Sequence, residues 1–260
     1  MQIYLAAAPS DVQAAARCAC PLAHAAYRIG PDSTLLRQSL LLQSRGGLLS
    51  VSDREAPPIR DADALCAAVL RECGRRGYQG VLADFDQPPQ PDRQVFLRRL
   101  GEQLAASRRT LFLPERYGDA GISAVRIIGT AVSGGSFQDH LRQSAQHWGG
   151  ADRCALDVER LRMDFPLPCP TGLGEPLTAE DLETRLRESP PFFSQELCAR
   201  YCTYTRDGQL HFVLFDDAGT LRQKLRTGTA MGFAAAFLMW PEVRDLAGEL
   251  FRGGAVGAVK

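Results

Sequence analysis

The sequence of 260 residues has no excess of charge of either sign. It carries 30 Lys and Arg side chains against 30 Asp and Glu, so its formal net charge is zero. A chain without a net field has no long-range attraction to nucleic acid or to an anionic membrane surface. We therefore expect no nucleic acid and no membrane as partners, and any ligand must be recognised locally by shape and contacts.

Long hydrophobic runs and a leader segment are also missing. No stretch of about 18 apolar residues occurs, which excludes an ordinary transmembrane helix and membrane insertion. The N-terminal letters MQIYLAAAPSDV enter a predicted strand without the basic segment, apolar stretch and cleavage site of a signal peptide. The sequence therefore predicts a cytoplasmic protein, or one that lies within an assembled particle.

The cysteines lack the spacing of a zinc site. The eight cysteines include two close pairs, Cys18 with Cys20 and Cys198 with Cys202, and neither pair has CxxC spacing. The four histidines do not cluster with them. We expect free and mostly buried thiols, no metal site and no cofactor.

Apolar strand-like runs alternate with amphipathic stretches along the chain, which is typical of helices that cover a parallel sheet. The expected strands are residues 2–8, 22–28, 47–52, 79–86, 109–114, 124–132, 153–158 and 233–240. The expected helices are residues 10–18, 33–45, 62–76, 92–106, 136–148, 178–188, 194–200 and 217–230. A (β/α)8 barrel takes about 250 residues. The sequence thus predicts the α/β class and one TIM barrel domain over residues 1–260.

Residues 160–215 interrupt this alternation. They contain a proline-rich loop, a predicted helix and two β-prone runs around Asp207-Gly208, which is typical of a hairpin. We predict a small insertion, helix plus hairpin, before the last helix and strand of the barrel. An alternative stays open, in which His211 to Phe215 is itself a barrel strand.

The segment Tyr78 to Asp86, YQGVLADFD, is an apolar run that ends in two carboxylates two positions apart. Strand alternation places Asp84 and Asp86 on the same face as Gly80 and Leu82. Both acids are therefore expected at the carboxyl end of a strand. In a parallel barrel this end carries the catalytic groups.

GYQGVLADFD resembles the fourth-strand signature DGxDxDxE of glycoside hydrolase family 18, the family of chitinases and spore-type peptidoglycan N-acetylglucosaminidases. Asp84 matches the family's Asp that orients the acetamido group of the substrate. Asp86 stands where the family has its acid Glu, and Gln79 and Leu82 replace two further acids.

Two more segments resemble the same family. Leu48 to Asp53, LLSVSD, resembles the third-strand motif SxGG with Ser50 kept. FDDAGTLRQKLRTGTAMGFAAAFLMW resembles the last helix and strand, whose final Trp forms the floor of the sugar site, and Trp240 occupies that place. The three matches follow the order expected for one barrel.

The resemblance implies hydrolysis of a β-linked N-acetylglucosamine glycan, of the peptidoglycan or chitin type, by substrate assistance. An acid protonates the glycosidic oxygen while the N-acetyl oxygen of the sugar attacks the anomeric carbon. Asp86 would be the acid and Asp84 its partner. Since the side chain of Asp is one methylene shorter than that of Glu, we expect the activity to be impaired.

Further acids are expected around the same mouth. CALD at residues 154–157 resembles the family's MxYD motif, with Asp157 kept and Leu156 in place of the Tyr. Glu115 and Tyr117 follow the strand TLFLP, and Glu242 follows Trp240. We predict that a bound N-acetylglucosamine oligosaccharide contacts these residues together with Ser50.

Two other functions remain open. The barrel could be a catalytically inactive carbohydrate-binding or structural protein, with Gln79, Leu82, Asp86 and Leu156 as signs of lost catalysis. Alternatively, the loop AVSGGSF at residues 131–137 runs from a strand to a helix start, where backbone amides can hold a phosphate. This loop lacks the Lys of a P-loop.

Overall fold

The computed structural model describes residues 1–38, 45–118 and 121–251. Eight parallel strands form a closed ring, because the first strand pairs with both the last and the second. The ring order follows the chain: β1 (Gln2–Ala7), β2 (Leu22–Ile29), β4 (Leu48–Ser52), β5 (Gly80–Asp84), β6 (Thr110–Pro114), β7 (Val125–Gly129), β8 (Cys154–Asp157) and β14 (Ala235–Met239). The predicted (β/α)8 barrel is confirmed, and all eight strands lie where the sequence placed them.

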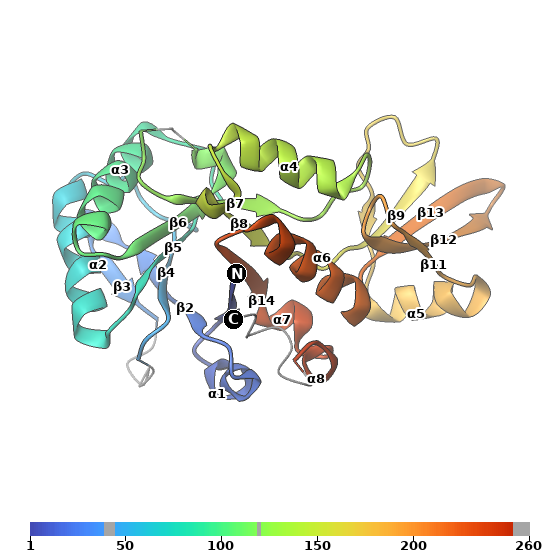
Figure 1. Ribbon diagram of the computed structural model, residues 1–260, viewed down its shortest axis with the longest axis horizontal. Coiled ribbons are helices and arrows are strands. Elements are labelled where there is room, and N and C mark those ends of the chain that lie inside the picture. The colour runs from blue at the N-terminus through green and yellow to red at the C-terminus, as the bar shows by residue number, and fades with distance from the viewer. Residues whose placement is uncertain (39–44, 119–120, 252–260) are drawn as a thin grey trace.

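Helices cover the outside of this ring (Figure 1). The longer ones are α2 (Ala62–Arg76), α3 (Pro91–Ala106), α4 (Phe137–His147) and α6 (Ala218–Met231). Short helices complete the cover: α1 (Val12–Ala15), α7 (Trp240–Val243) and α8 (Ala247–Leu250). The starts of α2, α4 and α6 are set by Asp61, Ser136 and Asp217, whose side chains accept hydrogen bonds from first-turn amides. Between β6 and β7 the described residues form only a 3-10 turn, η3 (Glu115–Tyr117).

Two of the predicted helices are wrong. Residues 31–33 form a 3-10 turn and Leu35–Arg37 form β3, which pairs antiparallel with β2; residues 39–44 of the predicted helix lie outside the described residues. The hydroxyl of Ser33, read as a helix start, instead accepts hydrogen bonds from the amides of Arg60 and Asp61. The predicted helix at 194–200 is replaced by the ends of two strands around Cys198, which has a positive φ of 51°.

The expected insertion is present between β8 and α6 and contains a second sheet. Its strands are β9 (Arg162–Leu167), β10 (Glu175–Pro176), β11 (Phe192–Ser194), β12 (Ala199–Arg206) and β13 (Gln209–Phe215), all antiparallel, with helix α5 (Ala179–Glu188) against one face. The hairpin at Asp207-Gly208 is confirmed, and His211 lies in β13, so the alternative that made it a barrel strand is wrong. Figure 1 shows this sheet beside the barrel, beyond α4 and α6. The limits of the insertion, 160–215, remain a prediction.

The apolar core of the barrel has three parts because both faces of the ring are buried, and the insertion has two small clusters of its own. The interior of the ring is filled by a cluster that includes Tyr4, Leu82, Phe112 and Phe237. Two larger clusters lie between the strands and the helices, one under α2 and α3 and one under α4 and α6. All eight cysteines are free, as expected, and five of them are buried. No helix within the described ranges has both the length and the hydrophobicity to cross a membrane.

Candidate functional site

The site predicted at the end of β5 lies above the apolar cluster that fills the interior of the ring. Leu82 belongs to the cluster that fills the ring, and the next residue on that face is Asp84. Phe112 and Phe237 pack in the same layer as Leu82, with their ring centroids 5.1 Å apart. Asp84 therefore leaves the strand at the carboxyl mouth of the barrel, with hydrophobic side chains beneath it.

The carboxyl group of Asp84 holds its proton more tightly than an ordinary aspartate. Burial raises its pKa to about 6, and the nearby charges of Asp86 and Asp53 act in the same direction, while Arg116 opposes them. A carboxyl with a pKa close to neutral pH is suited to general acid work.

Asp157 enters the same mouth from β8, on the far side of the ring. Its neighbour on the interior face, Ala155, belongs to the central cluster, and Asp157 is in register with Gly129 of β7 and Phe237 of β14. Burial raises the pKa of Asp157 to about 7, with further contributions from Glu159, Glu242, Asp84 and Asp86. The electrostatic coupling of Asp157 to Asp84 and Asp86 brings together three of the acids that the sequence singled out.

Asp86 has different surroundings. The strand ends at Asp84, and the side chain of Asp86 is 74% exposed, with its Oδ1 3.7 Å from an Nη of Arg116. Its catalytic role stays a prediction. Its charge nevertheless raises the pKa of both Asp84 and Asp157, so Asp86 belongs to the same electrostatic group.

Asp53 is a residue that sequence reasoning missed as part of this site. Its side chain is fully buried, and its Oδ1 accepts a hydrogen bond of 2.8 Å from the backbone N–H of Asp86. The side chain of Gln87 donates to the backbone carbonyl of Asp53. The available signal was an acid directly after the strand LLSVS, at the end of the barrel where functional groups gather.

Trp240 lies directly after β14, at the carboxyl end of the ring. Trp240 is only 7% exposed and belongs to the cluster under α6 that includes Leu221, Leu238 and Val243. The residue of β14 that joins the interior cluster at this level is Met239. Little of the indole is thus available to a ligand, and its predicted role as a sugar platform remains untested.

Glu242 is half-buried in the first turn of α7, and its charge acts on the acids of the mouth. Its charge raises the pKa of Asp157 and Glu159. Arg160 borders it by donating to the backbone carbonyl of Glu242 at 2.9 Å and to the carboxylate of Asp245. These contacts hold the guanidinium of Arg160 beside α7, where it forms an ion pair with Asp245.

Ser50 and Tyr117 are almost fully buried near the mouth, and their contacts with a ligand stay predictions. Ser50 is 2% exposed inside the ring, in register with Leu82 and so one layer below Asp84. Tyr117 is 1% exposed, packs edge to face on Phe85, and donates to the carbonyl of Gln87 at 2.8 Å. Both side chains support the mouth from below or behind.

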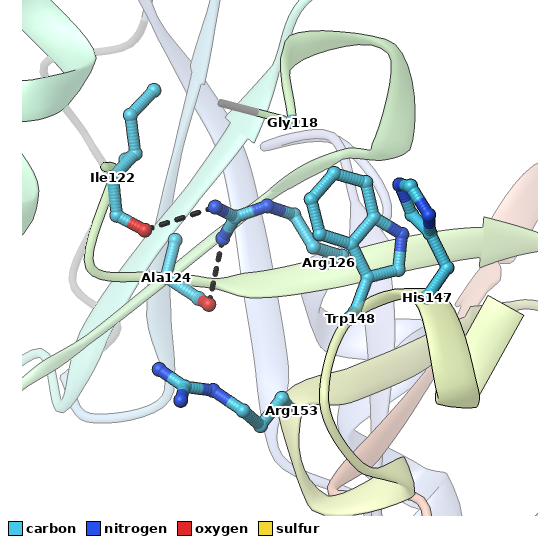
Figure 2. A pocket seen from close by; sticks show the side chains of 7 residues that line it. All are labelled: Gly118, Ile122, Ala124, Arg126, His147, Trp148 and Arg153. Carbon is cyan, nitrogen blue, oxygen red and sulfur yellow. Dashed lines mark hydrogen bonds between the residues drawn. The ribbon is translucent and has the colours of Figure 1, made fainter. Parts of the chain in front are cut away.

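Glu115 is directed away from the mouth, to a hollow on the outer side of β7. Its Oε1 accepts a hydrogen bond of 2.9 Å from the indole N–H of Trp148. Trp148 lines a cavity of about 420 Å³ together with Arg126, whose guanidinium donates to the carbonyls of Ile122 and Ala124 (Figure 2). This hollow lies where the barrel has the short η3 connection, and Glu115 belongs to it by contact.

Two of the amides at the start of α4, beside the glycine-containing loop at 131–137, already have partners within the protein. The N–H of Phe137 donates to the carbonyl of Glu196 in the insertion, and the N–H of Asp139 donates to the hydroxyl of Ser136. The carboxylate of Asp139 lies in the same first turn and disfavours an anion there. The described residues also contain no group of three or more His, Cys, Asp and Glu arranged to hold a metal ion.

Comparison with solved structures shows which known barrels this fold is similar to. The spore cortex-lytic enzyme SleL of Bacillus cereus has a TM-score of 0.65 at 16% identity, covering 99% of this chain and 76% of that chain. The SleL of Bacillus megaterium has a TM-score of 0.65 at 12% identity, with 96% and 74% covered. A glycoside hydrolase family 18 chitinase of Cycas revoluta, in complex with (GlcNAc)3, has a TM-score of 0.64 at 13% identity, with 97% and 98% covered.

These likenesses establish the fold class: the chain has a barrel like that of glycoside hydrolase family 18. The resemblance expected from the strand motifs is thereby confirmed at the level of the fold. No protein-family model and no curated protein matches the chain in sequence.

Proposed function

We propose that the protein binds a β-linked N-acetylglucosamine glycan across the carboxyl mouth of the barrel and hydrolyses it slowly by substrate assistance. The observation that carries the proposal is the pair of half-buried carboxyls at the mouth, Asp84 and Asp157, whose pKa values are raised to about 6 and about 7. A proton donor for the glycosidic oxygen must be protonated near the working pH, and these two groups meet that requirement. The similar barrels of known chitinases and of SleL support the glycan as the ligand.

In this proposal, Asp84 and Asp157 divide the two tasks that substrate assistance requires. One protonated carboxyl donates to the glycosidic oxygen, while the second carboxylate accepts a hydrogen bond from the acetamido N–H and directs the N-acetyl oxygen at the anomeric carbon. Asp86 acts through its charge, which adds to the effect of burial in raising the pKa of both groups. The resemblance in sequence gives Asp86 the donor role instead, and the variants below separate these assignments.

The test is cleavage of a chromogenic N-acetylglucosamine oligomer at pH 4 to 8. We expect Asp84→Asn and Asp157→Asn to abolish cleavage, and Asp86→Asn to retain part of it with the alkaline limb of the pH profile moved to lower pH. Loss of all cleavage in Asp86→Asn alone would assign the donor role to Asp86. The matched control is Asp245→Asn, a rim acid that is paired with Arg160.

Binding without turnover is the second candidate, favoured by the exposure of Asp86 and its contact with Arg116. It predicts that the oligomer raises the melting temperature of the wild type without being cleaved, and that Asp157→Asn reduces this shift. If the oligomer is neither cleaved nor stabilising, both candidates are rejected.

A further inference from the structure

One face of the insertion sheet has no helix of the described residues against it, and part of this face is closed by a small core cluster in which Phe165, Ala199 and Leu214 are buried. Its opposite face packs against α5 through Leu182, Cys202, Val213 and Phe215. On the uncovered face, Phe192 is 56% exposed and Leu210 is 47% exposed. A contiguous apolar patch on a folded domain marks a surface that meets another molecule, so the side chains between these two residues decide whether they belong to one patch.

A row of aromatic side chains crosses this uncovered face. The register of the sheet pairs Phe192 with Tyr201 and pairs Phe212 with Phe165, so these four side chains project from the same side. Ring centroids lie 5.7 Å apart for Phe192 and Tyr201, 5.3 Å for Tyr201 and Phe212, and 6.5 Å for Phe212 and Phe165. The row crosses four strands: Phe192 is exposed, Tyr201 and Phe212 are half-buried, and Phe165 is buried at the other end of the row.

The same face carries no charge. The registers place these other side chains on it, and none is ionisable: Met163, Leu167, Pro176, Ser194, Ala199, Thr203, Thr205, Leu210 and Leu214. Of these, Ala199 and Leu214 are buried and do not contribute to the open surface. The charged residues of the sheet, such as Asp164, Arg200 and Arg206, project from the face that bears α5. Exposed hydroxyls of Thr203 and Thr205 lie beside the aromatic row.

The uncharged, aromatic character of this face favours some classes of ligand over others. Nucleic acid and anionic membranes are bound through basic side chains, which this face does not have. Aromatic rings with nearby hydroxyl groups fit a pyranose chain, whose C–H faces stack on rings while its hydroxyls exchange hydrogen bonds. An uncharged face also fits an uncharged polymer better than one that bears carboxylates.

We propose that the uncovered face of the insertion sheet, centred on Phe192, Tyr201 and Phe212, is a second binding surface for an uncharged N-acetylglucosamine polymer. The inference rests on the proposed function, because the polymer is the one assigned to the mouth. The insertion leaves the barrel after β8 and returns at the start of α6, so both of its connections lie on the carboxyl side of the ring. The face holds the polymer, and the mouth acts on it.

The chain offers a matched pair of variants. Phe192 and Phe193 are neighbours in β11 with similar exposure, 56% and 45%, but project from opposite faces of the sheet. We expect Phe192→Ala to weaken binding to insoluble chitin by about fivefold to tenfold in a sedimentation assay, and Phe193→Ala to leave it unchanged. Thr203→Glu, which adds a charge at an exposed site beside the row, should weaken chitin binding at least as much without removing core contacts.

Further measurements separate this surface from the mouth. Cleavage or binding of an N-acetylglucosamine trimer should be the same in Phe192→Ala, Thr203→Glu and wild type, while Asp157→Asn should lose the trimer reaction and still sediment with chitin. If Phe192→Ala and Thr203→Glu both sediment with chitin as the wild type does, the surface is rejected and the mouth is untouched by that result. A concentration-dependent dimer that Phe192→Ala abolishes, or retention by purified peptidoglycan but not by chitin, would also overturn the proposal.

Discussion

The carboxylate of Asp53 accepts a hydrogen bond from the backbone N–H of Asp86, with Oδ1 and N 2.8 Å apart. The contact joins the ends of β4 and β5 at the mouth of the barrel. Because Asp53 is fully buried, this one side chain both fixes the turn that carries Asp86 and adds negative charge beside Asp84. The carboxylate of Asp53 thus contributes both to the position of the turn at Asp86 and to the raised pKa of Asp84.

Removing the Asp53 carboxylate should loosen this turn. Asp53→Ala removes the acceptor of a part-buried hydrogen bond from the N–H of Asp86, which we expect to lower the free energy of unfolding by about 1–2 kcal/mol. Urea denaturation measures the change, with Glu102→Ala on the exposed side of α3 as the control, expected within about 0.5 kcal/mol of wild type. Equal stability of Asp53→Ala and wild type would show that the contact contributes nothing.

The acidic mouth should make the protein less stable as the pH rises. Since the folded pKa of Asp157 is about 7 against an ordinary value of 3.8, the folded state keeps a proton that the unfolded state has already lost. The free energy of unfolding therefore falls between about pH 4 and pH 7. Asp157→Asn should flatten this fall and raise stability at pH 8 by about 1–2 kcal/mol, with little change at pH 4.

Asp245→Asn is the control, because the stability that Asp245 contributes should change with pH in the opposite direction. The pKa of Asp245 is lowered, partly by the hydrogen bond and charge of Arg160, so its ionised form stabilises the fold above its ordinary pKa. Its replacement should reduce stability at neutral pH, and the difference from wild type should vanish as the pH falls through the folded pKa. Thermal denaturation across pH 3 to 8 compares the two variants; parallel profiles would contradict the assignment.

Lys224 in α6 and Asp216, which lies between β13 and α6, form a fully buried ion pair with Nζ and Oδ2 2.7 Å apart. The same carboxylate accepts the N–H of Leu161 and the hydroxyl of Thr220. Lys224→Met leaves a buried carboxylate without its cation, and we expect a loss of about 3–5 kcal/mol in guanidinium denaturation. Arg187→Met, which breaks an exposed pair with Glu183 on α5, should cost less than about 1 kcal/mol.

Two helical glycines should respond oppositely to alanine. A methyl group at Gly74 in α2 meets nothing within 4 Å, so Gly74→Ala should stabilise the protein by about 0.5–1 kcal/mol through helix propensity. At Gly101 in α3 the same methyl group would lie 2.7 Å from the carbonyl oxygen of Ser123. Gly101→Ala should therefore lower the melting temperature, and a gain in both variants would contradict this packing.

Local periodicity was sufficient to place the barrel strands, since each is a short apolar run between turn signals. It also placed α2 at 62–76, where Asp61 caps the start and Gly77 ends the helix with a positive φ. The prediction of helix starts was wrong where a residue typical of a helix cap forms its hydrogen bonds with a distant segment instead. Ser33 was read as a helix start, but its hydroxyl is bound by the amides of Arg60 and Asp61, a contact that local sequence does not encode.

The sequence by itself determined the ring of parallel strands and the emergence of Asp84 and Asp157 at its carboxyl end, because strand alternation and strand direction are local properties of the chain. Tertiary structure alone decided which predicted residues share an environment. It buried Trp240 and Tyr117, directed Glu115 to Trp148, and brought in Asp53. Burial and proton affinity depend on neighbours from distant segments, and the charges around Asp157 come from β5, the end of β8 and α7.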